Sequence, residues 1–464
     1  MRSRLIYPLV LCVLLAGCGQ VPTPSAGQVV TVVAYPPPVW TEEPTEPPLP
    51  TMTPWPTLPT TPTPTYPPGP PKPTPEVTPI LPFPTPAFAP TPQGPRPAVL
   101  GTIWYPYLPS PDAHPVLQAV LVDKEGRRWG EAERTFDFPP GGGTDWRALH
   151  ISPDGRSFIA DIGYHEESRS FWVNPASGEL RPVSTEPEHE DFLAWGPAGQ
   201  VFTWSASGHR QVCLLDMETQ QCRVFQFPMS EYGYSLLRAL ATSPDGLTLA
   251  DLCIYGPTVS HPGSEVTVSI QPSTGGDRLP VATLSIPEGA DAPGNHLTWS
   301  PNGRSLAFIL FTGMYDNDLG NDDGQLWLVD ENGAPEIVAH GLAVYPPVAW
   351  SPDGRYIAFV RRAAYEKSAP ADLWLFDLAT STEIQLTRLD ERRYVTSVAW
   401  SPDGQRLAFA VTLEIGDSVE GLDKIGDYGE IWMTSLDGQE QYPIAGPTAP
   451  DAPVAWLPAT EGGQ

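Results

Sequence analysis

Basic residues are scarce in this chain. It has 26 lysines and arginines against 54 aspartates and glutamates, which gives a formal net charge of −28. The charges of residues 1–97 cancel, so the whole excess lies on residues 98–464. Because neutralising phosphates requires clustered lysine and arginine, and no basic cluster is visible, the composition excludes nucleic acid as a partner. We interpret the charge as an acidic surface that resists association, with an acidic site for cations as the alternative.

Histidine is also scarce, with eight residues scattered along the chain. The clusters of histidine with acidic residues are "HEES" at 165–168 and "EHED" at 188–191, and both fall where we expect loops or loop edges. We interpret them as solvated loop charge. A metal or acid–base site is the alternative, and it would require several histidines to converge on one face.

The apolar run at the N-terminus is too short to span a bilayer. Leu5–Leu15 follows the positive charges of Arg2 and Arg4, as in a secretory signal. Residues 15–18, Leu-Ala-Gly-Cys, complete a pattern that resembles the signal of bacterial lipoproteins. The resemblance implies that residues 1–17 are a signal peptide, cleaved before Cys18, and that the sulfur of Cys18 carries diacylglycerol. An ordinary signal peptide with an incidental cysteine is the alternative.

Lipidation of Cys18 would place the protein outside the cytoplasm and anchor it to a membrane, because two or more acyl chains anchor stably. The next residue is Gly19 and not the aspartate that favours retention in the inner membrane. Anchoring to the cell membrane and anchoring to the outer membrane therefore both stay open.

Residues 18–97 are predicted to form a disordered linker behind the lipidated cysteine. Residues 19–97 hold 28 of the chain's 60 prolines, many alternating with threonine, as in "PTLPTTPTPTYPPGPPKPTPEVTP" at 56–79. Such a sequence lacks the backbone donors and the apolar surface that folding needs. At about 3.1 Å per residue in an extended polyproline conformation, it would reach on the order of 200 Å. We expect a semi-rigid spacer between the membrane and a folded domain at 98–464.

Cysteine is rare, with five residues. Cys12 would leave with the signal peptide, and Cys18 would be lipidated. Cys213 and Cys222 flank the turn in "CLLDMETQQC", so they can form a disulfide if they face each other across that hairpin in an oxidising compartment. Cys253 would then remain unpaired in a buried strand, and three free thiols are the alternative.

Nearly the same ten residues recur through the folded part. The copies are "ISPDGRSFIA" at 151–160, "TSPDGLTLAD" at 242–251, "WSPNGRSLAF" at 299–308, "WSPDGRYIAF" at 350–359 and "WSPDGQRLAF" at 400–409. Proline sets the second position of a type I turn, and glycine takes the left-handed conformation that closes a bulged hairpin. The predicted turn residues are Asp154, Gly155, Asp245, Gly246, Asn302, Gly303, Asp353, Gly354, Asp403 and Gly404.

Each copy begins a unit of four antiparallel strands. The segment after the turn, as in 356–360, is apolar on both alternating faces, which is typical of a strand buried on two sides. A second hairpin follows in each unit, as in "LWLFDLATSTEIQLT" at 373–387. Four-stranded units repeated at this length are the blades of an all-β propeller.

We predict seven blades, with one blade shared by the two ends of the folded part. Degenerate corners at Gly196 and Leu457 complete the count, and the last one can supply only an innermost strand. "LGTIWYPY" at 100–107 and "LQAVLVDKEGRRWGE" at 117–131 are the candidates for the missing three strands. Such sharing removes open sheet edges. Six blades with an extra N-terminal hairpin are the alternative.

At these residues the chain resembles the TolB-type propeller family, whose WD40-like repeat (PD40) carries the same Trp-Ser-Pro-Asp-Gly and Ala-Phe pattern. The resemblance covers about 98–464 and implies the fold more than the function, because the motif marks a turn. The family's namesake has an α/β domain before its propeller, where this chain has a predicted anchor and tether, so that protein's role is not carried over. Peptidases of the prolyl-oligopeptidase type add a hydrolase domain to a similar propeller. No Gly-x-Ser-x-Gly elbow occurs here, so we do not expect that activity.

The segment "YDNDLGNDDG" at 315–324 is a candidate calcium loop. Its closely spaced carboxylates are Asp316, Asp318, Asp322 and Asp323. The spacing of an EF-hand is not met, and no bidentate glutamate lies at the right distance. A solvated acidic loop is the alternative, and calcium is the one cofactor considered.

Three long connections, 311–324, 361–371 and 411–428, are predicted on the propeller face opposite the Ser-Pro-Asp-Gly turns. The first and third are acidic, and the second carries Arg361, Arg362 and Lys367. Long loops on a rigid scaffold are where binding residues concentrate, so we expect this face to contact a partner or a cation. The alternative is that the loops pair with one another, acid to base.

The leading hypothesis is a lipid-anchored, non-enzymatic binding or scaffolding module of the cell envelope, with an envelope protein or glycan as partner. A polysaccharide-active enzyme is the second hypothesis, because some lyases resembling this fold use propeller histidines around a metal. A purely structural surface protein is the third.

Overall fold

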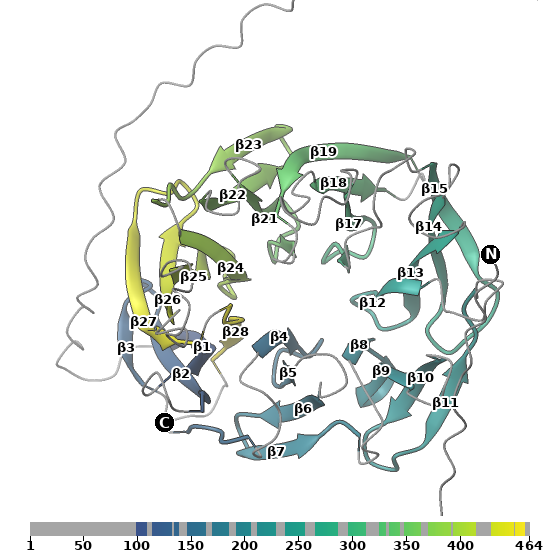
Figure 1. Ribbon diagram of the computed structural model, residues 1–464, viewed down its shortest axis with the longest axis horizontal. Coiled ribbons are helices and arrows are strands. Elements are labelled where there is room, and N and C mark those ends of the chain that lie inside the picture. The colour runs from purple at the N-terminus through teal and green to yellow at the C-terminus, as the bar shows by residue number, and fades with distance from the viewer. Residues whose placement is uncertain are drawn as a thin grey trace, which may run out of the picture. The chain divides into compact units, whose positions relative to one another are not determined.

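The structure is a computed structural model, and it describes part of residues 99–459. The described ranges are 99–108, 114–131, 134–138, 146–163, 169–184, 192–205, 211–228, 237–255, 265–285, 296–311, 324–330, 334–343, 348–362, 370–390, 393–413, 428–449 and 451–459. These ranges contain 28 β-strands and a short 3-10 turn at Pro197–Gly199. The strands form seven four-stranded antiparallel blades around a common axis (Figure 1).

The first six blades follow one another along the chain, each running from an innermost to an outermost strand. Blade 1 holds β4 (Trp146–Ile151), β5 (Phe158–Ile162), β6 (Arg169–Asn174) and β7 (Glu179–Pro182). Blade 2 holds β8 (Phe192–Trp195), β9 (Gln200–Ser205), β10 (Gln211–Asp216) and β11 (Cys222–Phe225). Blade 3 holds β12 (Leu237–Thr242), β13 (Thr248–Tyr255), β14 (Glu265–Pro272) and β15 (Leu279–Ser285).

The next three blades repeat this order. Blade 4 holds β16 (Leu297–Trp299), β17 (Leu306–Phe311), β18 (Gly324–Val329) and β19 (Pro335–Leu342). Blade 5 holds β20 (Ala349–Trp350), β21 (Tyr356–Arg362), β22 (Ala371–Asp377) and β23 (Thr382–Gln385). Blade 6 holds β24 (Arg393–Trp400), β25 (Arg406–Leu413), β26 (Tyr428–Ser435) and β27 (Gln441–Thr448).

Blade 7 is built from both ends of the folded part, which confirms the predicted closure. Its innermost strand is β28 (Ala455–Pro458), and the others are β1 (Val99–Tyr107), β2 (Val116–Asp123) and β3 (Arg128–Glu131). Strand β28 pairs antiparallel with β1, with Thr102 opposite Leu457. Figure 1 shows β28 beside β1 and β2, although the chain joins them only through the other six blades. The six-bladed alternative is wrong, because the N-terminal strands complete a blade.

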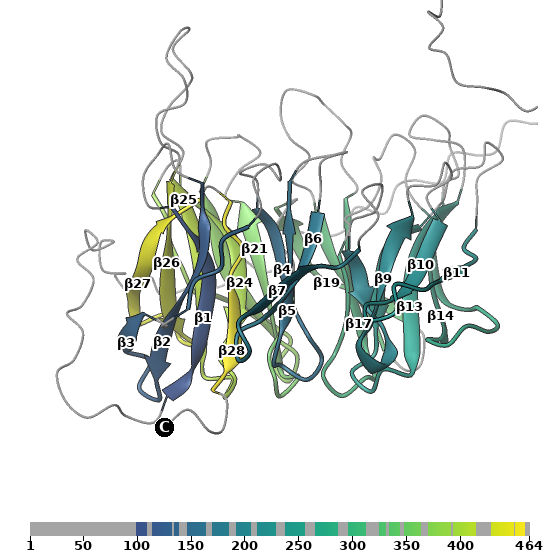
Figure 2. The ribbon, with the colours of Figure 1, turned by 90° about the horizontal axis from the view of Figure 1, so that it is seen from below.

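The corner turns, which join the first and second strands of a blade, adopt the predicted geometry. Their glycines have left-handed backbones, with φ of 66° at Gly155, 73° at Gly354 and 68° at Gly404. A side chain larger than hydrogen is strained at this φ, so glycine is strongly favoured. The corner turns lie on one face of the ring, here called the turn face, at the lower side of Figure 2. The opposite face, called the loop face, takes the connections between second and third strands and between blades.

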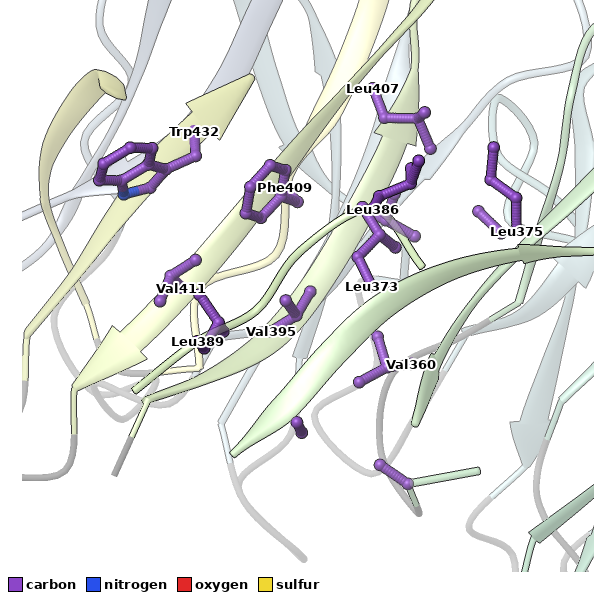
Figure 3. Close-up of a cluster of buried hydrophobic side chains, with 14 of the residues drawn as sticks. Val360, Leu373, Leu375, Leu386, Leu389, Val395, Leu407, Phe409, Val411 and Trp432 are labelled. Carbon is purple, nitrogen blue, oxygen red and sulfur yellow. The ribbon is translucent and has the colours of Figure 1, made fainter. Parts of the chain in front are cut away.

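Seven buried apolar clusters fill the spaces between neighbouring blades. Figure 3 shows the cluster between blades 5 and 6, to which β22 contributes Leu373 and Leu375 and β25 contributes Phe409 and Val411. Burial on both faces explains why strands such as β25 are apolar at successive positions. Blade 7 follows the same rule, because Trp456 packs in the cluster with blade 6 and Leu457 in the cluster with blade 1.

One detail of the predicted loops is wrong. Arg361 and Arg362 belong to the end of β21 and not to the connection that follows it. Arg361 pairs with Glu383 of the same blade at 2.6 Å and lies over the ring of Trp374. The positive charge of Arg361 is therefore neutralised within its own blade. The prediction failed because strand pairing continues beyond the end of the apolar pattern.

Candidate functional site

The polar residues of the corner turns bond within each turn. In blade 5 the hydroxyl of Ser351 donates to Oδ1 of Asp353 at 2.6 Å and accepts the N–H of Tyr356 at 2.8 Å. Asp353 also accepts the N–H of Arg355 at 3.0 Å. The Ser351 hydroxyl holds the pKa of Asp353 below its usual value. The same serine bond is made to Asp154, Asp245, Asn302 and Asp403.

In several copies of the repeat, the tryptophan that precedes the corner turn forms a hydrogen bond to the preceding blade. Its indole N–H donates to a main-chain carbonyl of that blade's first strand, from Trp195 to His150 (3.2 Å), Trp299 to Ala241 (3.0 Å) and Trp400 to Ala349 (3.0 Å). Thr242, which replaces tryptophan in blade 3, donates its hydroxyl to the carbonyl of Trp195. At Trp350 and Trp456 the indole N–H is buried and has no hydrogen-bond partner among the residues that the structure describes.

The proline and glycine of the repeat also meet across blades. A β-carbon at Gly404 would lie 3.4 Å from Cδ of Pro352 in the preceding blade. Gly354 faces Pro301 in the same way, and Gly303 faces Pro244. The recurring motif therefore joins adjacent blades on the turn face, and it does not by itself form a ligand site.

A polar network between blades 1 and 2 contains the residue types of a catalytic triad in a different order. Nε2 of His150 lies 2.8 Å from Oδ2 of Asp161, and the hydroxyl of Ser170 donates to Oδ1 of the same carboxylate. The N–H of Phe192 donates to the Ser170 oxygen at 3.1 Å. The Ser170 hydroxyl donates its proton to the carboxylate and not to the imidazole, so this arrangement is not that of a serine activated by histidine. The network joins the two blades.

Blade 3 contains a second buried polar group. Asp251 is fully buried, and Nε of Arg278 donates to both of its carboxylate oxygens at 2.8 and 2.9 Å. Burial raises the pKa of Asp251, and the guanidinium opposes that rise. The thiol of Cys253 donates to Asp251 at 3.2 Å, and burial raises the pKa of this thiol. Cys253 is therefore a free, buried cysteine in a strand, as expected, and a poor nucleophile at neutral pH.

Cys213 and Cys222 lie on neighbouring strands of blade 2 and are joined in the structure, with 5.5 Å between their Cα atoms. They are not directly opposite, because Cys213 pairs with Val224 and Cys222 with Leu215. Side chains two positions apart on a strand share a face, so this diagonal pair still meets on one side of the sheet.

The innermost strands differ in charge from the rest of this acidic chain. Their sequences are WRALHI, FLAW, LRALAT, LTW, AW, RYVTSVAW and AWLP. Within these seven described strands there is no aspartate or glutamate, whereas there are three arginines. The arginines are Arg147, Arg238 and Arg393, each at the first or second position of its strand. Innermost strands begin at the loop face, so all three lie at that end.

Sequence reasoning missed these arginines, although a signal for two of them exists. Arg147 and Arg238 begin the same tripeptide, Arg-Ala-Leu, and precede the corner serine of their blades by the same interval. In both strands the register shifts at the arginine, as in a β-bulge. Both arginines are exposed, while the preceding residues, Trp146 and Leu237, are buried.

Several predicted site residues lie outside the described residues. They are Cys18, the calcium candidates Asp316, Asp318, Asp322 and Asp323, and the His–acid clusters at 165–168 and 188–191. Among the described residues, no group of three or more His, Cys, Asp or Glu side chains is placed to hold a metal ion. The same part of the chain contains no helix that is long and apolar enough to cross a membrane.

No family model matches the chain, and no curated protein matches it. Solved structures that are similar include TolB from Acinetobacter baumannii, at 15% identity over 76% of this chain and 82% of that chain, with a TM-score of 0.40. An oligogalacturonate lyase in complex with manganese is 15% identical over 75% of this chain and 84% of that chain, with a TM-score of 0.46. The hydrazine synthase of Kuenenia stuttgartiensis is 16% identical over 69% of this chain and 100% of that chain, with a TM-score of 0.43. The seven-bladed propeller itself is established by the strand pairing described above.

Proposed function

We propose that this chain is a lipid-anchored, extracytoplasmic β-propeller that acts as a non-enzymatic binding or scaffolding module of the cell envelope. The observation that supports this most is the difference between the two faces of the ring. On the turn face the repeat residues bond within the turns and to neighbouring blades. On the loop face the connections differ widely from blade to blade.

Blade 6 illustrates the difference in length. Its corner turn runs only from Trp400 to Arg406, whereas the connection between its second and third strands runs from Leu413 to Tyr428. The corresponding connection in blade 2 is short, from Ser205 to Gln211. Variable connections on a rigid scaffold are where binding residues concentrate, so the loop face is the proposed working face.

The anchor is proposed from the sequence alone. The lipoprotein pattern ends at Cys18, and the proline-rich segment at 19–97 would hold the ring away from the membrane. Changing Cys18 to serine is expected to release the protein from the membrane fraction and to abolish its labelling by fatty acid. Unchanged sedimentation with membranes, without fatty-acid labelling of the unmodified protein, would exclude the lipoprotein assignment.

The working face is tested by shortening residues 414–427 to a minimal turn. This change leaves β25 and β26 at their observed bounds, so the blade should still form. The matched control is R304A/Q405A, which alters two exposed side chains of the turn face. Capture of partners from envelope extracts should fall in the shortened variant and persist in the control. The proposal fails if the control loses capture and the shortened variant keeps it.

A further inference from the structure

We propose that a water molecule is bound between blades 2 and 3, held by the side chains of Ser269 and Gln271 beside the carboxylate of Asp251. The site belongs to the interior of the ring, at a place where three other blades have aromatic side chains. This inference goes beyond the proposed function and does not depend on it.

Blade 3 departs from the repeat at a buried position. The copies in blades 4, 5 and 6 end in Ala-Phe, and their phenylalanines, Phe308, Phe359 and Phe409, are fully buried. The copy in blade 3 ends in Ala-Asp, so Asp251 takes the same position, and its side chain is equally buried. Burial of a carboxylate is costly unless it is paired, so blade 3 requires polar partners that the other three blades do not need at this position.

The residue opposite this position differs as well. In blades 4, 5 and 6 a tryptophan lies directly opposite the phenylalanine, namely Trp327, Trp374 and Trp432. In blade 3 the residue opposite Asp251 is Ser269. An aspartate and a serine therefore replace a phenylalanine and a tryptophan. The exchange leaves less side-chain volume at this place and more polar groups to satisfy.

The polar side chains lie on one face of the blade. Ser269 and Gln271 are two positions apart in β14, so they point to the same side of the sheet. Their opposite residues in β13 are Asp251 and Leu249, and Leu249 packs in the apolar cluster between blades 2 and 3. The side chains of Asp251, Ser269 and Gln271 therefore all face blade 2.

Two polar atoms of this group lack a hydrogen-bond partner. Ser269 is fully buried and Gln271 is 6% exposed. Within the described ranges of the chain, Oγ of Ser269 and Nε2 of Gln271 bond to no other atom. A buried donor that loses water and gains no partner destabilises the folded state, so both atoms are expected to have a partner that is not a side chain or the backbone.

Water matches the chemistry of these groups. Its oxygen can accept the hydroxyl of Ser269 and an N–H of Gln271, and it can donate to Oδ2 of Asp251, which accepts Nε of Arg278 at 2.9 Å. Buried water typically makes about three such bonds to groups that would otherwise be unsatisfied. The charges of Asp251 and Arg278 balance each other, so the site favours a neutral ligand over an ion.

The first test is a crystal structure of the protein at a resolution that shows ordered water. We expect a water within about 2.7–3.2 Å of both Oγ of Ser269 and Nε2 of Gln271. The inference is overturned if no water contacts both atoms, as would be the case if the Ser269 hydroxyl donated directly to Asp251.

Thermal unfolding of S269A, Q271M and S269A/Q271M is the second test. If both side chains hold the water, each single change should lower Tm by about 1–3 °C. The double variant should lose less than the sum of the two losses, because both side chains bind the same water. If the two atoms are instead unsatisfied in the protein, their removal should leave Tm unchanged or raise it, and the inference is overturned.

The matched control combines T267V with Q271M. Thr267 is a buried residue on the same face of β14, and its hydroxyl lies 3.5 Å from the hydroxyl of Thr283. Because Thr267 has a protein partner, the losses of T267V and Q271M should add. Coupling as strong as in S269A/Q271M would indicate a general effect on the blade and would overturn the shared water. S269A should still capture envelope partners, so this result is separate from that of the shortened connection at 414–427.

Discussion

Gly155 of blade 1 lies against Pro458 of blade 7: a β-carbon on the glycine would stand 3.4 Å from Cγ of the proline. Gly404 and Pro352, from adjacent blades in mid-chain, have the same relationship. Pro458 belongs to the degenerate corner "WLP", which has lost the serine of the repeat but kept the proline. The contact between the two ends of the folded part is therefore of the same kind as the contacts between consecutive blades.

The hydrogen bonds that tryptophans form between blades predict that two equivalent tryptophans contribute differently to the stability of the protein. Trp299 and Trp350 occupy the same place in blades 4 and 5, and both are half-buried. The indole of Trp299 donates to the carbonyl of Ala241, whereas the buried indole N–H of Trp350 has no hydrogen-bond partner in the described part of the chain. We expect W299F to destabilise the protein by about 1 kcal/mol more than W350F, as measured by urea unfolding. Equal losses would mean that the bond between blades contributes nothing to stability.

The aspartates of the corner turns predict how the stability of the folded protein depends on pH. The Ser351 hydroxyl lowers the pKa of Asp353 in the folded protein, so its contribution to stability is present above the unfolded pKa, about 3.9, and is lost as the pH falls through the folded value. Asn302 fills the same position in blade 4 and accepts from Ser300 at 2.8 Å. D353N should therefore fold and cost less than about 1 kcal/mol at neutral pH.

The reciprocal variant provides the control. On acidification the difference in unfolding free energy between D353N and the unmodified protein should shrink, because the asparagine does not titrate. N302D should instead acquire a loss of stability at low pH. A gap between D353N and the unmodified protein that widens on acidification would contradict the assignment.

The cysteine pair makes a prediction for peptide mapping. Trypsin cleaves after Arg210 and Arg223, so Cys213 and Cys222 fall in one peptide. After denaturation without reduction, we expect this peptide to take up no alkylating agent, while Cys253 becomes labelled once unfolding exposes its buried thiol. Reduction should add two alkyl groups to the peptide. Full labelling of the peptide before reduction would show that the bridge is not formed in the protein.

Much of the fold was predictable because the repeat encodes a local structure. Each Ser-Pro-Asp-Gly marks one turn at the same place in a blade, so the copies count the blades and the leftover strands identify the closure. The position of Arg147 and Arg238 at the start of innermost strands was not recognised, because it depends on which strand is innermost and on a register shift that only strand pairing reveals. The network of Asp161 and Ser170 was missed for the same reason, since cross-strand register brings them together.

Ring closure is tested most directly by a disulfide placed across blade 7. Thr102 of β1 and Leu457 of β28 are opposite one another, and opposite residues of antiparallel strands are close enough for a disulfide. T102C/L457C should form this link under mild oxidation, detected as a peptide that joins residues 102 and 457. In T102C/P458C the second cysteine comes from the next residue of β28 and points to the other face, so little link is expected. If T102C/L457C remains unlinked, or both variants link equally, the ring is not closed by pairing of β1 with β28.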